Sequence, residues 1–301
     1  MKDDELAGLG LEEIAEKIES MEIRGAAKIA RAGAYALKEE AMESDDDDLD
    51  ERIKEAVERL KRTRPTAVSL QNALRFVTGE KGSGFTVDVI KERVESFIRR
   101  SHSAGKKIAE YGGKRISDGN TILTHCNSSM ALGAIKYAWD QGKEIDVIAT
   151  ESRPKKQGYI TVRELAEYGI PVTLIVDSAV RYKMTDVNHV YVGADTIASN
   201  GAVINKIGTS QVALCAHEAR VPFTVCAETY KFSRETAFGD LVKIEERGPE
   251  EIVDPDEFSD VKISNPVFDA TPANYIDSVV TEEGIISPSE SYRVIKEMMR
   301  G

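Results

Sequence analysis

Short apolar runs rich in β-branched residues alternate with helical patterns from about Gly112 onward, and this alternation constrains the fold more than any other feature. The runs span residues 121–124, 145–150, 171–177, 189–193 and 222–227. The candidate helices between them span residues 129–141, 161–168 and 210–219. Strands separated by helices are typical of βαβ units, in which successive strands pair in parallel. We therefore predict an α/β fold with a mostly parallel sheet that helices cover on both faces.

The segment before Gly112 has a helical pattern. Apolar residues recur three or four positions apart at Leu11, Ile14 and Ile18, and again at Ile53, Val57 and Leu60. A chain of 301 residues is long enough for two domains. We predict a small helical N-terminal domain over residues 1–112 and a domain containing the sheet over residues 113–301.

The charge balance restricts the kind of partner that this chain can bind. The net charge is -12 and the sequence pI is about 5.0, which disfavours nucleic acid and anionic membranes. No apolar run approaches the roughly 20 residues that span a bilayer, and the acidic start is unlike a signal peptide. We expect a cytoplasmic protein that binds neither nucleic acid nor a membrane.

Cysteine and glycine patterns argue against metal ions and nucleotide cofactors. Three cysteines and four scattered histidines form neither a disulfide framework nor a set of zinc ligands. The sequence contains no complete dinucleotide-binding glycine fingerprint and no Walker-type phosphate loop. We expect no metal and no cofactor.

Polar and reactive side chains follow nearly every predicted strand. Ligands of open parallel sheets bind beyond the carboxyl ends of the strands, where such side chains converge. The tips comprise residues 125–128, 151–154, 177–178, 194–196 and 228–231. The sequence therefore predicts a site at this edge of the sheet.

Cys126 and Asp195 are the reactive candidates at this edge. Cys126 precedes a predicted helix, whose positive end would lower the thiol pKa and favour the thiolate. Asn127, Ser128 and Ser129 would supply caps and backbone N–H groups for an anion. The alternative for Cys126 is an inert, buried thiol. A partly desolvated Asp195 facing a thiolate would have a raised pKa suited to proton donation; the alternative is that it only caps the next turn.

A few cations would have to bind any anionic ligand against the negative overall charge. Arg24, Arg64, Arg153 and Lys231 are the candidate phosphate ligands. Asn205 and Lys206 lie ten residues beyond Asp195, and we interpret them as part of the glycine-bearing loop at residues 199–201, from which they would extend to the same edge. Taken singly, an exposed Arg or Lys is more often a solvated surface charge, and only their positions in the motifs favour a binding role.

Five motifs in a fixed order resemble one superfamily. It unites methylthioribose-1-phosphate isomerases, ribose-1,5-bisphosphate isomerases and the regulatory subunits of the translation-initiation guanine-exchange factor. The resemblance covers the chain from about Glu22 to its C-terminal segment. The motifs are Thr124-His125-Cys126-Asn127-Ser128, Glu151-Ser152-Arg153-Pro154 with Gln157-Gly158, Gly169-Ile170-Pro171-Val172-Thr173, Gly193-Ala194-Asp195 and Asn205-Lys206-Ile207-Gly208-Thr209. The resemblance implies a Rossmann-like second domain and a homo-oligomer, either a dimer or a hexamer built as a trimer of dimers.

Two features separate the members of this superfamily. The isomerases keep a cysteine and an aspartate at the positions of Cys126 and Asp195, which the regulatory subunits typically lack. The segment from Ala227 to Ser233 resembles the ribose-1,5-bisphosphate type, although its Lys-Phe pair also resembles the regulatory subunits. A second phosphate needs another cation, such as Lys231, where a methylthio group needs an apolar slot.

The resemblance implies conversion of ribose 1,5-bisphosphate to ribulose 1,5-bisphosphate, in an archaeal nucleoside (AMP) salvage route that feeds ribulose-bisphosphate carboxylase. Cys126 would be the base at C2 and Asp195 the acid, with a hydride shift as a rival route. The alternatives are a methylthioribose-1-phosphate isomerase and a non-catalytic regulatory subunit. The implied substrate-binding residues are Arg24, Gly25, Ala26, Ala27, Arg64, Ser128, Ser129, Met130, Arg153, Asn205, Lys206 and Lys231.

Overall fold

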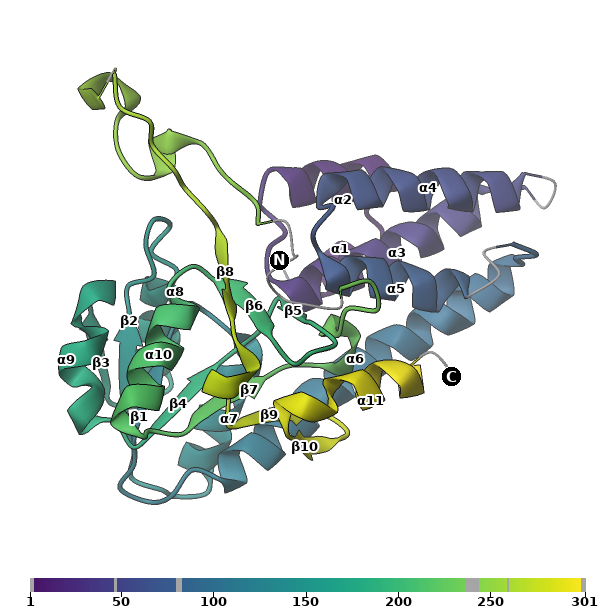
Figure 1. Cartoon of the computed structure of the whole chain (residues 1–301). Helices are drawn as coiled ribbons and strands as arrows, with labels where there is room; N and C mark the ends of the chain where they lie inside the picture. Colours follow the sequence, from purple (N-terminus) through teal and green to yellow (C-terminus); the bar gives the residue numbers. More distant parts are fainter. Residues whose placement is uncertain (1–2, 46–47, 80–82, 237–243, 259, 299–301) are drawn as a thin grey trace. The chain divides into compact units, whose positions relative to one another are not determined.

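The computed structural model in Figure 1 describes the whole chain except residues 1–2, 46–47, 80–82, 237–243, 259 and 299–301. It contains two compact units, Met1–Ser103 and Ala104–Gly301, and the division falls within helix α6 (Val87–Lys114). The sequence-based boundary at residue 112 lies in the same helix. No helix in the described part of the chain is long and apolar enough to cross a membrane.

The first unit is built around helix α3 (Ala26–Glu43), which packs against α2, α4 and α5. The apolar residues that predicted these helices face its interior, because Ile14 and Ile18 of α2 and Ile53 of α4 are fully buried. Gly33 permits the close approach of α3 and α5, since a Cβ there would collide with Leu70. The unit also contains α1 (Asp3–Leu6), α2 (Leu11–Glu19), α4 (Leu49–Thr63), α5 (Val68–Thr78) and the first part of α6, as far as Ser103.

The second unit contains a seven-stranded sheet in the order β10-β9-β7-β4-β1-β2-β3. Every neighbouring pair is parallel except β9 and β10. The predicted α/β class with a mostly parallel sheet is therefore confirmed. The strands of this sheet are β1 (Thr121–Thr124), β2 (Asp146–Thr150), β3 (Val172–Ile175), β4 (His189–Val192), β7 (Phe223–Cys226), β9 (Ser278–Thr281) and β10 (Gly284–Ile286).

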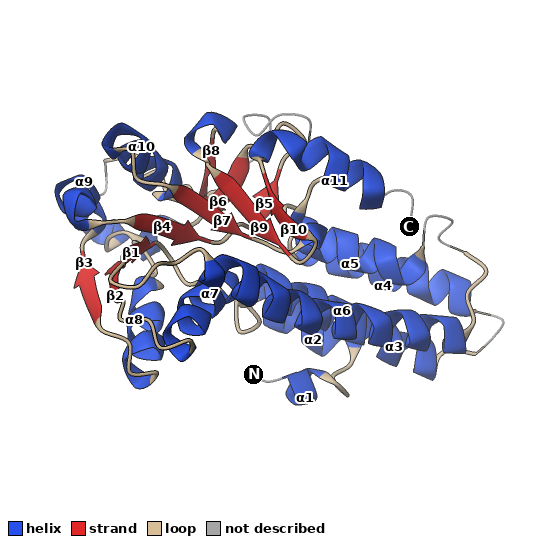
Figure 2. Ribbon diagram, turned by 90° about the horizontal axis from the view of Figure 1, so that it is seen from below, coloured by secondary structure: helices blue, strands red, loops and turns tan. Residues whose placement is uncertain are grey.

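Helices cover both faces of this sheet, as Figure 2 shows. Alternate strand residues point to opposite faces: Val190 and Val192 of β4 belong to the core under α9, α10 and α11, whereas Tyr191 belongs to the core under α6, α7 and α8. The buried strands therefore join two hydrophobic cores. The covering helices are α7 (Ser129–Asp140), α8 (Gly158–Glu167), α9 (Val180–Lys183), α10 (Thr209–Ala219) and α11 (Ser291–Met298).

A small antiparallel sheet has the strand order β5-β6-β8. Along the chain, β5 and β6 lie between β4 and β7 of the large sheet, and β8 lies between β7 and β9. Its strands are β5 (Thr196–Ile197), β6 (Val203–Lys206) and β8 (Phe268–Thr271). Asn205 and Lys206 are the last residues of β6 and pair with Asp269 and Phe268 of β8. The interpretation of these two residues as part of a loop is wrong, because the strand pairing continues through its polar end.

Candidate active site

The carboxyl ends of β1 and β4 lie at the topological switch point of the sheet. From β1 the chain adds β2 and β3 on one side, and β4 then pairs with β1 on its other side. Open α/β sheets bind ligands at such a point. Cys126 follows β1 closely, and Asp195 lies between β4 and β5.

Close contact joins the two strand tips. A Cβ on Gly193 would collide with the side chain of Ser128, so only glycine fits between the tips of β4 and β1. Ser128 is the N-cap of α7, and its hydroxyl accepts a hydrogen bond from the amide of Ala131 at 3.3 Å. The structure therefore brings the Cys126 and Asp195 motifs together and confirms the predicted cap.

Hydrogen bonds from the loop after β2 and from α8 hold the backbone of Cys126. The residue has a left-handed φ of 69°. Its amide donates to Ser152 Oγ at 2.7 Å, and its carbonyl accepts from Thr161 Oγ1 at 2.8 Å. Its thiol donates to Gln157 Oε1 at 3.5 Å. The loop after β2 and the start of α8 thus fix the orientation of the sulfur atom.

The thiol of Cys126 is not activated in the way that its place in the sequence suggests. Burial raises its pKa to about 11, and the carboxylates of Asp195 and Asp177 add to this rise. The charge of Lys206 and the amide of Asn127 oppose it. The expected lowering of the pKa is wrong, because desolvation of the thiol outweighs the helix start that follows it. Cys126 is partly exposed as a residue, but the protein atoms around its thiol still disfavour the charged form.

Lys206 is the cation whose charge acts on the Cys126 thiol. It is 7% exposed, and its Nζ atom lies 4.9 Å from the centre of the Phe268 ring. Burial lowers its pKa, which Cys126 and Asp195 partly restore. Within the described residues its ammonium makes no hydrogen bond or salt bridge. It is therefore available to an anionic ligand.

Lys231 lies in a buried ion pair. Its Nζ atom is 2.8 Å from Glu228 Oε2, and the fully buried Glu228 lies two residues after β7. The pair keeps the pKa of Glu228 below its usual value although burial alone would raise it, and Tyr230 donates to the other carboxylate oxygen at 2.9 Å. Any phosphate bound by Lys231 would share this cation with Glu228.

Arg153 and Met130, two of the predicted substrate-binding residues, contact protein groups away from Cys126. Arg153 is exposed, and its guanidinium donates to the carbonyl of Ile252 at 3.0 Å. Ile252 belongs to the segment before β8, which extends away from the sheet in Figure 1. Met130 lies in α7, with its methyl group over Gly105 of α6. Ser129, the first residue of α7, is exposed.

Five of the predicted substrate-binding residues lie in the helical unit. Gly25 is the N-cap of α3 with φ 87° and no side-chain cap, and Ala26 and Ala27 begin the helix behind the exposed Arg24. Arg64 ends α4, and its guanidinium contacts the sulfur of Met21, just ahead of these residues. Uncapped amides at a helix start can bind phosphate, so this group stays a prediction for a phosphate site.

Sequence reasoning gave no role to several polar residues of the site. His125, Thr150, Ser152 and Asp177 follow or end β1, β2 and β3 and are joined by hydrogen bonds. Their position at strand ends was the available signal. Asp269 accepts from the amides of Gly208 and Ser210 at the start of α10, and burial raises its pKa to about 6. It lies on β8, a strand that the sequence pattern did not predict.

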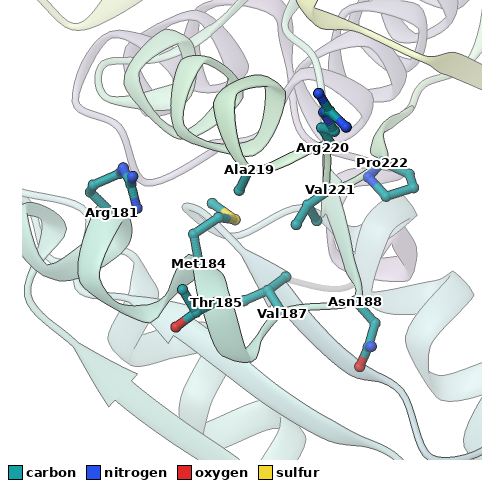
Figure 3. Close-up of a pocket in the computed structure, with 9 residues that line it drawn as sticks. All are labelled: Arg181, Met184, Thr185, Val187, Asn188, Ala219, Arg220, Val221 and Pro222. Atoms are coloured by element: carbon teal, nitrogen blue, oxygen red, sulfur yellow. The ribbon is translucent and has the colours of Figure 1, made fainter.

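A pocket of about 500 Å³ lies at the other end of the sheet, where Asn188 and Pro222 directly precede β4 and β7. Figure 3 shows Met184, Val187 and Val221 at its centre. It is separate from Cys126, which lies beyond the carboxyl end of β1. Among the described residues, no group of three or more His, Cys, Asp or Glu side chains is arranged to hold a metal ion.

Comparison with known proteins identifies the family. The model of the Initiation factor 2 subunit family matches residues 22–288. The chain belongs to this family. A solved structure of the Pyrococcus horikoshii translation initiation factor eIF-2B is similar to this chain, with a TM-score of 0.85 and 35% sequence identity. The match covers 94% of this chain and 98% of the other.

Two curated relatives from one organism, Archaeoglobus fulgidus, differ in their similarity to this chain. Its ribose 1,5-bisphosphate isomerase is 54% identical, covering 95% of this chain and 93% of the relative. Its putative methylthioribose-1-phosphate isomerase is 38% identical, covering 95% of this chain and 90% of the relative. The family thus includes proteins with different names, and this chain is more similar to the first than to the second.

Proposed function

We propose that this chain is an isomerase that converts ribose 1,5-bisphosphate to ribulose 1,5-bisphosphate. The observation that carries the proposal is its greater identity, over nearly the full length, to the first of the two A. fulgidus relatives. The retained Cys126 and Asp195 at the switch point support an enzyme rather than a regulatory subunit. We further propose that the product feeds ribulose-bisphosphate carboxylase in nucleoside salvage.

The proposed reaction needs two proton-transferring groups. Asp195, as the acid, donates a proton to the ring oxygen and the C1–O4 bond breaks. Cys126 thiolate then removes the proton from C2, giving an enol phosphate with a C1–C2 double bond. Return of that proton to C1, with loss of the O2 proton to the Asp195 carboxylate, completes the ketone. Both groups end in their starting protonation states, so no cofactor is consumed.

The electrostatics of the site set a condition on this mechanism. With a pKa of about 11, only about one Cys126 side chain in 10⁴ is a thiolate at pH 7. The charge of Lys206 lowers the Cys126 pKa, so we propose that Lys206 assists formation of the thiolate as well as binding the substrate. The thiolate fraction available for this step should rise with pH.

We propose that Lys231 contacts the second phosphate while it remains paired with Glu228. Lys231→Met would leave Glu228 charged, buried and unpaired, and we expect the free energy of unfolding to fall by about 3 kcal/mol. The double variant Glu228→Gln/Lys231→Met removes both charges and should recover most of this stability. Urea denaturation of the three proteins measures the effect.

The double variant then isolates the role of Lys231 in binding. It should bind ribose 1,5-bisphosphate more weakly by about 1.5–3 kcal/mol, as expected for the loss of a charge-assisted hydrogen bond. Ribose 1-phosphate and ribose 5-phosphate identify the phosphate concerned, because the ligand lacking it should bind both proteins equally. Equal losses for all three ligands would exclude Lys231 from a phosphate site.

We also propose that the chain forms a homo-oligomer, a dimer or a hexamer. Edge strand β3 exposes Leu174, and Val176 and Tyr182 are exposed just beyond it. Exposed apolar side chains on an edge strand are typical of an interface. Sedimentation equilibrium at micromolar concentration should give a multiple of 33.1 kDa; the monomer mass would contradict the proposal.

Incubation of the pure protein with ribose 1,5-bisphosphate labelled with ¹³C at C2 tests the function. We expect a ketone signal from C2 of ribulose 1,5-bisphosphate. The alternative role as a regulatory subunit is suggested by the fold similarity to eIF-2B, and it predicts no turnover of any sugar phosphate. Unchanged substrate, with the protein folded and concentrated, would overturn the proposed enzyme.

A further inference from the structure

We propose that His125 is a positioning residue, which ties the backbone of Cys126 to the residue after Lys206 through one directed chain of hydrogen bonds. The proposal rests on the proposed function, because it assigns His125 to the same reaction. His125 directly follows β1, is 1% exposed, and precedes Cys126 in the sequence. Among the described residues its ring contacts Thr150, Ser152 and Ile207 and not the thiol, so its effect would be exerted through the backbone.

The partner of one ring nitrogen determines the tautomer of His125. Nε2 lies 2.8 Å from the carbonyl oxygen of Ile207. A carbonyl oxygen only accepts hydrogen bonds, so Nε2 must carry a proton. Burial lowers the pKa of His125 and favours the neutral ring, with Lys206 acting in the same direction and Asp177 opposing it. In the neutral ring Nδ1 is then an acceptor.

The remaining links follow from this tautomer. Thr150 Oγ1 lies 2.6 Å from Nδ1 and must donate to it. Thr150 Oγ1 can accept in turn from Ser152 Oγ at 3.2 Å, and Ser152 Oγ accepts the amide proton of Cys126 at 2.7 Å. Each hydroxyl thus donates once and accepts once. The alternative acceptors for the Ser152 proton, His125 Nδ1 and the Thr150 carbonyl, are more distant at 3.5 and 3.4 Å.

The chain of hydrogen bonds connects strand ends that come from different parts of the sequence. It begins at Cys126 after β1, passes through the end of β2, and ends at Ile207 after β6. Gly208, with φ 99°, provides the space for the ring, since a Cβ there would lie 3.0 Å from the Cε1 atom of His125. Asp177 fixes the middle of the chain by accepting from the amide of Ser152 at 2.8 Å. Breaking the chain should therefore shift Cys126 relative to Lys206.

Two substitutions break the chain at neighbouring links. His125→Gln can keep a donor near Ile207 but loses the acceptor for Thr150, and Thr150→Val removes the hydroxyl while keeping the side-chain shape. Each should lower kcat roughly 10- to 100-fold, as expected for a displaced catalytic group, with KM changed less than kcat. The matched control is Thr224→Val, which removes a buried Thr–His hydrogen bond to His189 (2.8 Å) in the same sheet. It should leave kcat unchanged.

The double variant distinguishes a chain from separate structural effects. If both residues act through one chain, His125→Gln/Thr150→Val should be no slower than the worse single variant. Multiplied losses, or near-normal kcat in Thr150→Val, would overturn the proposal. ¹⁵N NMR of the wild-type protein tests the chain without turnover: His125 should be protonated at Nε2, and a proton at Nδ1 would contradict it. Failure of the proposed function would show instead as a wild-type protein with no isomerase activity.

Discussion

Cys126→Ser is expected to lose several orders of magnitude in kcat while it still binds the substrate. Serine has nearly the size of cysteine and can keep the hydrogen bond to Gln157, which the thiol makes at 3.5 Å. Its hydroxyl is a far weaker acid than a thiol, so it has no comparable anionic fraction to remove the C2 proton. The loss should therefore appear in kcat more than in KM. Steady-state kinetics with isothermal titration of the substrate separate the two quantities.

The pH dependence of the wild-type protein provides the control for this substitution. Because the Cys126 pKa is raised to about 11, the thiolate fraction should grow roughly tenfold per pH unit from pH 7 to 10. Alkylation of Cys126 by iodoacetamide, measured by mass spectrometry, should follow this slope; Cys215 and Cys226 are buried. Near-normal turnover in Cys126→Ser would return Cys126 to the interpretation as an inert, buried thiol.

Asp195→Asn should also lose several orders of magnitude in turnover, because an amide can form hydrogen bonds but cannot deliver a proton to the ring oxygen. The same substitution should make the Cys126 thiol more reactive, although it slows turnover. The Asp195 charge raises the Cys126 pKa, so its removal should lower that pKa and speed alkylation at a fixed pH between 7 and 9. Slower turnover together with faster alkylation is the expected pattern.

Two results would contradict this account of Asp195. Retained turnover would leave Asp195 as a cap of the turn between β4 and β5. Unchanged alkylation would show that its charge does not reach the thiol. The matched control is Asp146→Asn, which removes an exposed carboxylate from the first residue of β2, at the opposite end of that strand, and should change neither quantity.

Solvent exchange tests the route of the C2 proton. Product formed in deuterated water should contain deuterium at C1 if the proton on the thiol exchanges before it returns. A direct hydride shift would transfer the hydrogen without this exchange. Partial labelling that increases when turnover is slowed by low temperature would still support the enol route, because a sheltered base has more time to exchange.

Much of the fold followed from local pattern. The runs that predicted strands contain β1, β2, β3, β4 and β7, because each is apolar, short and bounded by turns or helices. β5 has only two residues, and β6 ends in Asn205 and Lys206, so neither has the pattern of a buried strand. Their pairing partner β8 is distant in sequence, and only the folded chain shows that the three strands belong together.

The site was predictable in position but not in electrostatics. Residues at the ends of parallel strands converge by topology, which placed Cys126 and Asp195 at one edge. The Cys126 pKa depends on the burial of one atom and on charges from β6 and the β3 end, which no local rule supplies. The pairing of Lys231 with Glu228 and the tautomer of His125 likewise require distances between side chains. These are the points at which the structure changes the mechanism inferred from the sequence.

The most direct test of the central claim is the ratio of kcat/KM for ribose 1,5-bisphosphate and methylthioribose 1-phosphate, measured on one preparation. In the proposed mode of binding the second phosphate would gain a charge-assisted contact with Lys231, so we predict a preference for the bisphosphate of roughly 10- to 100-fold or more. The double variant Glu228→Gln/Lys231→Met should reduce this preference. A wild-type preference for methylthioribose 1-phosphate would contradict the proposed substrate while leaving the isomerase chemistry of Cys126 and Asp195 in place.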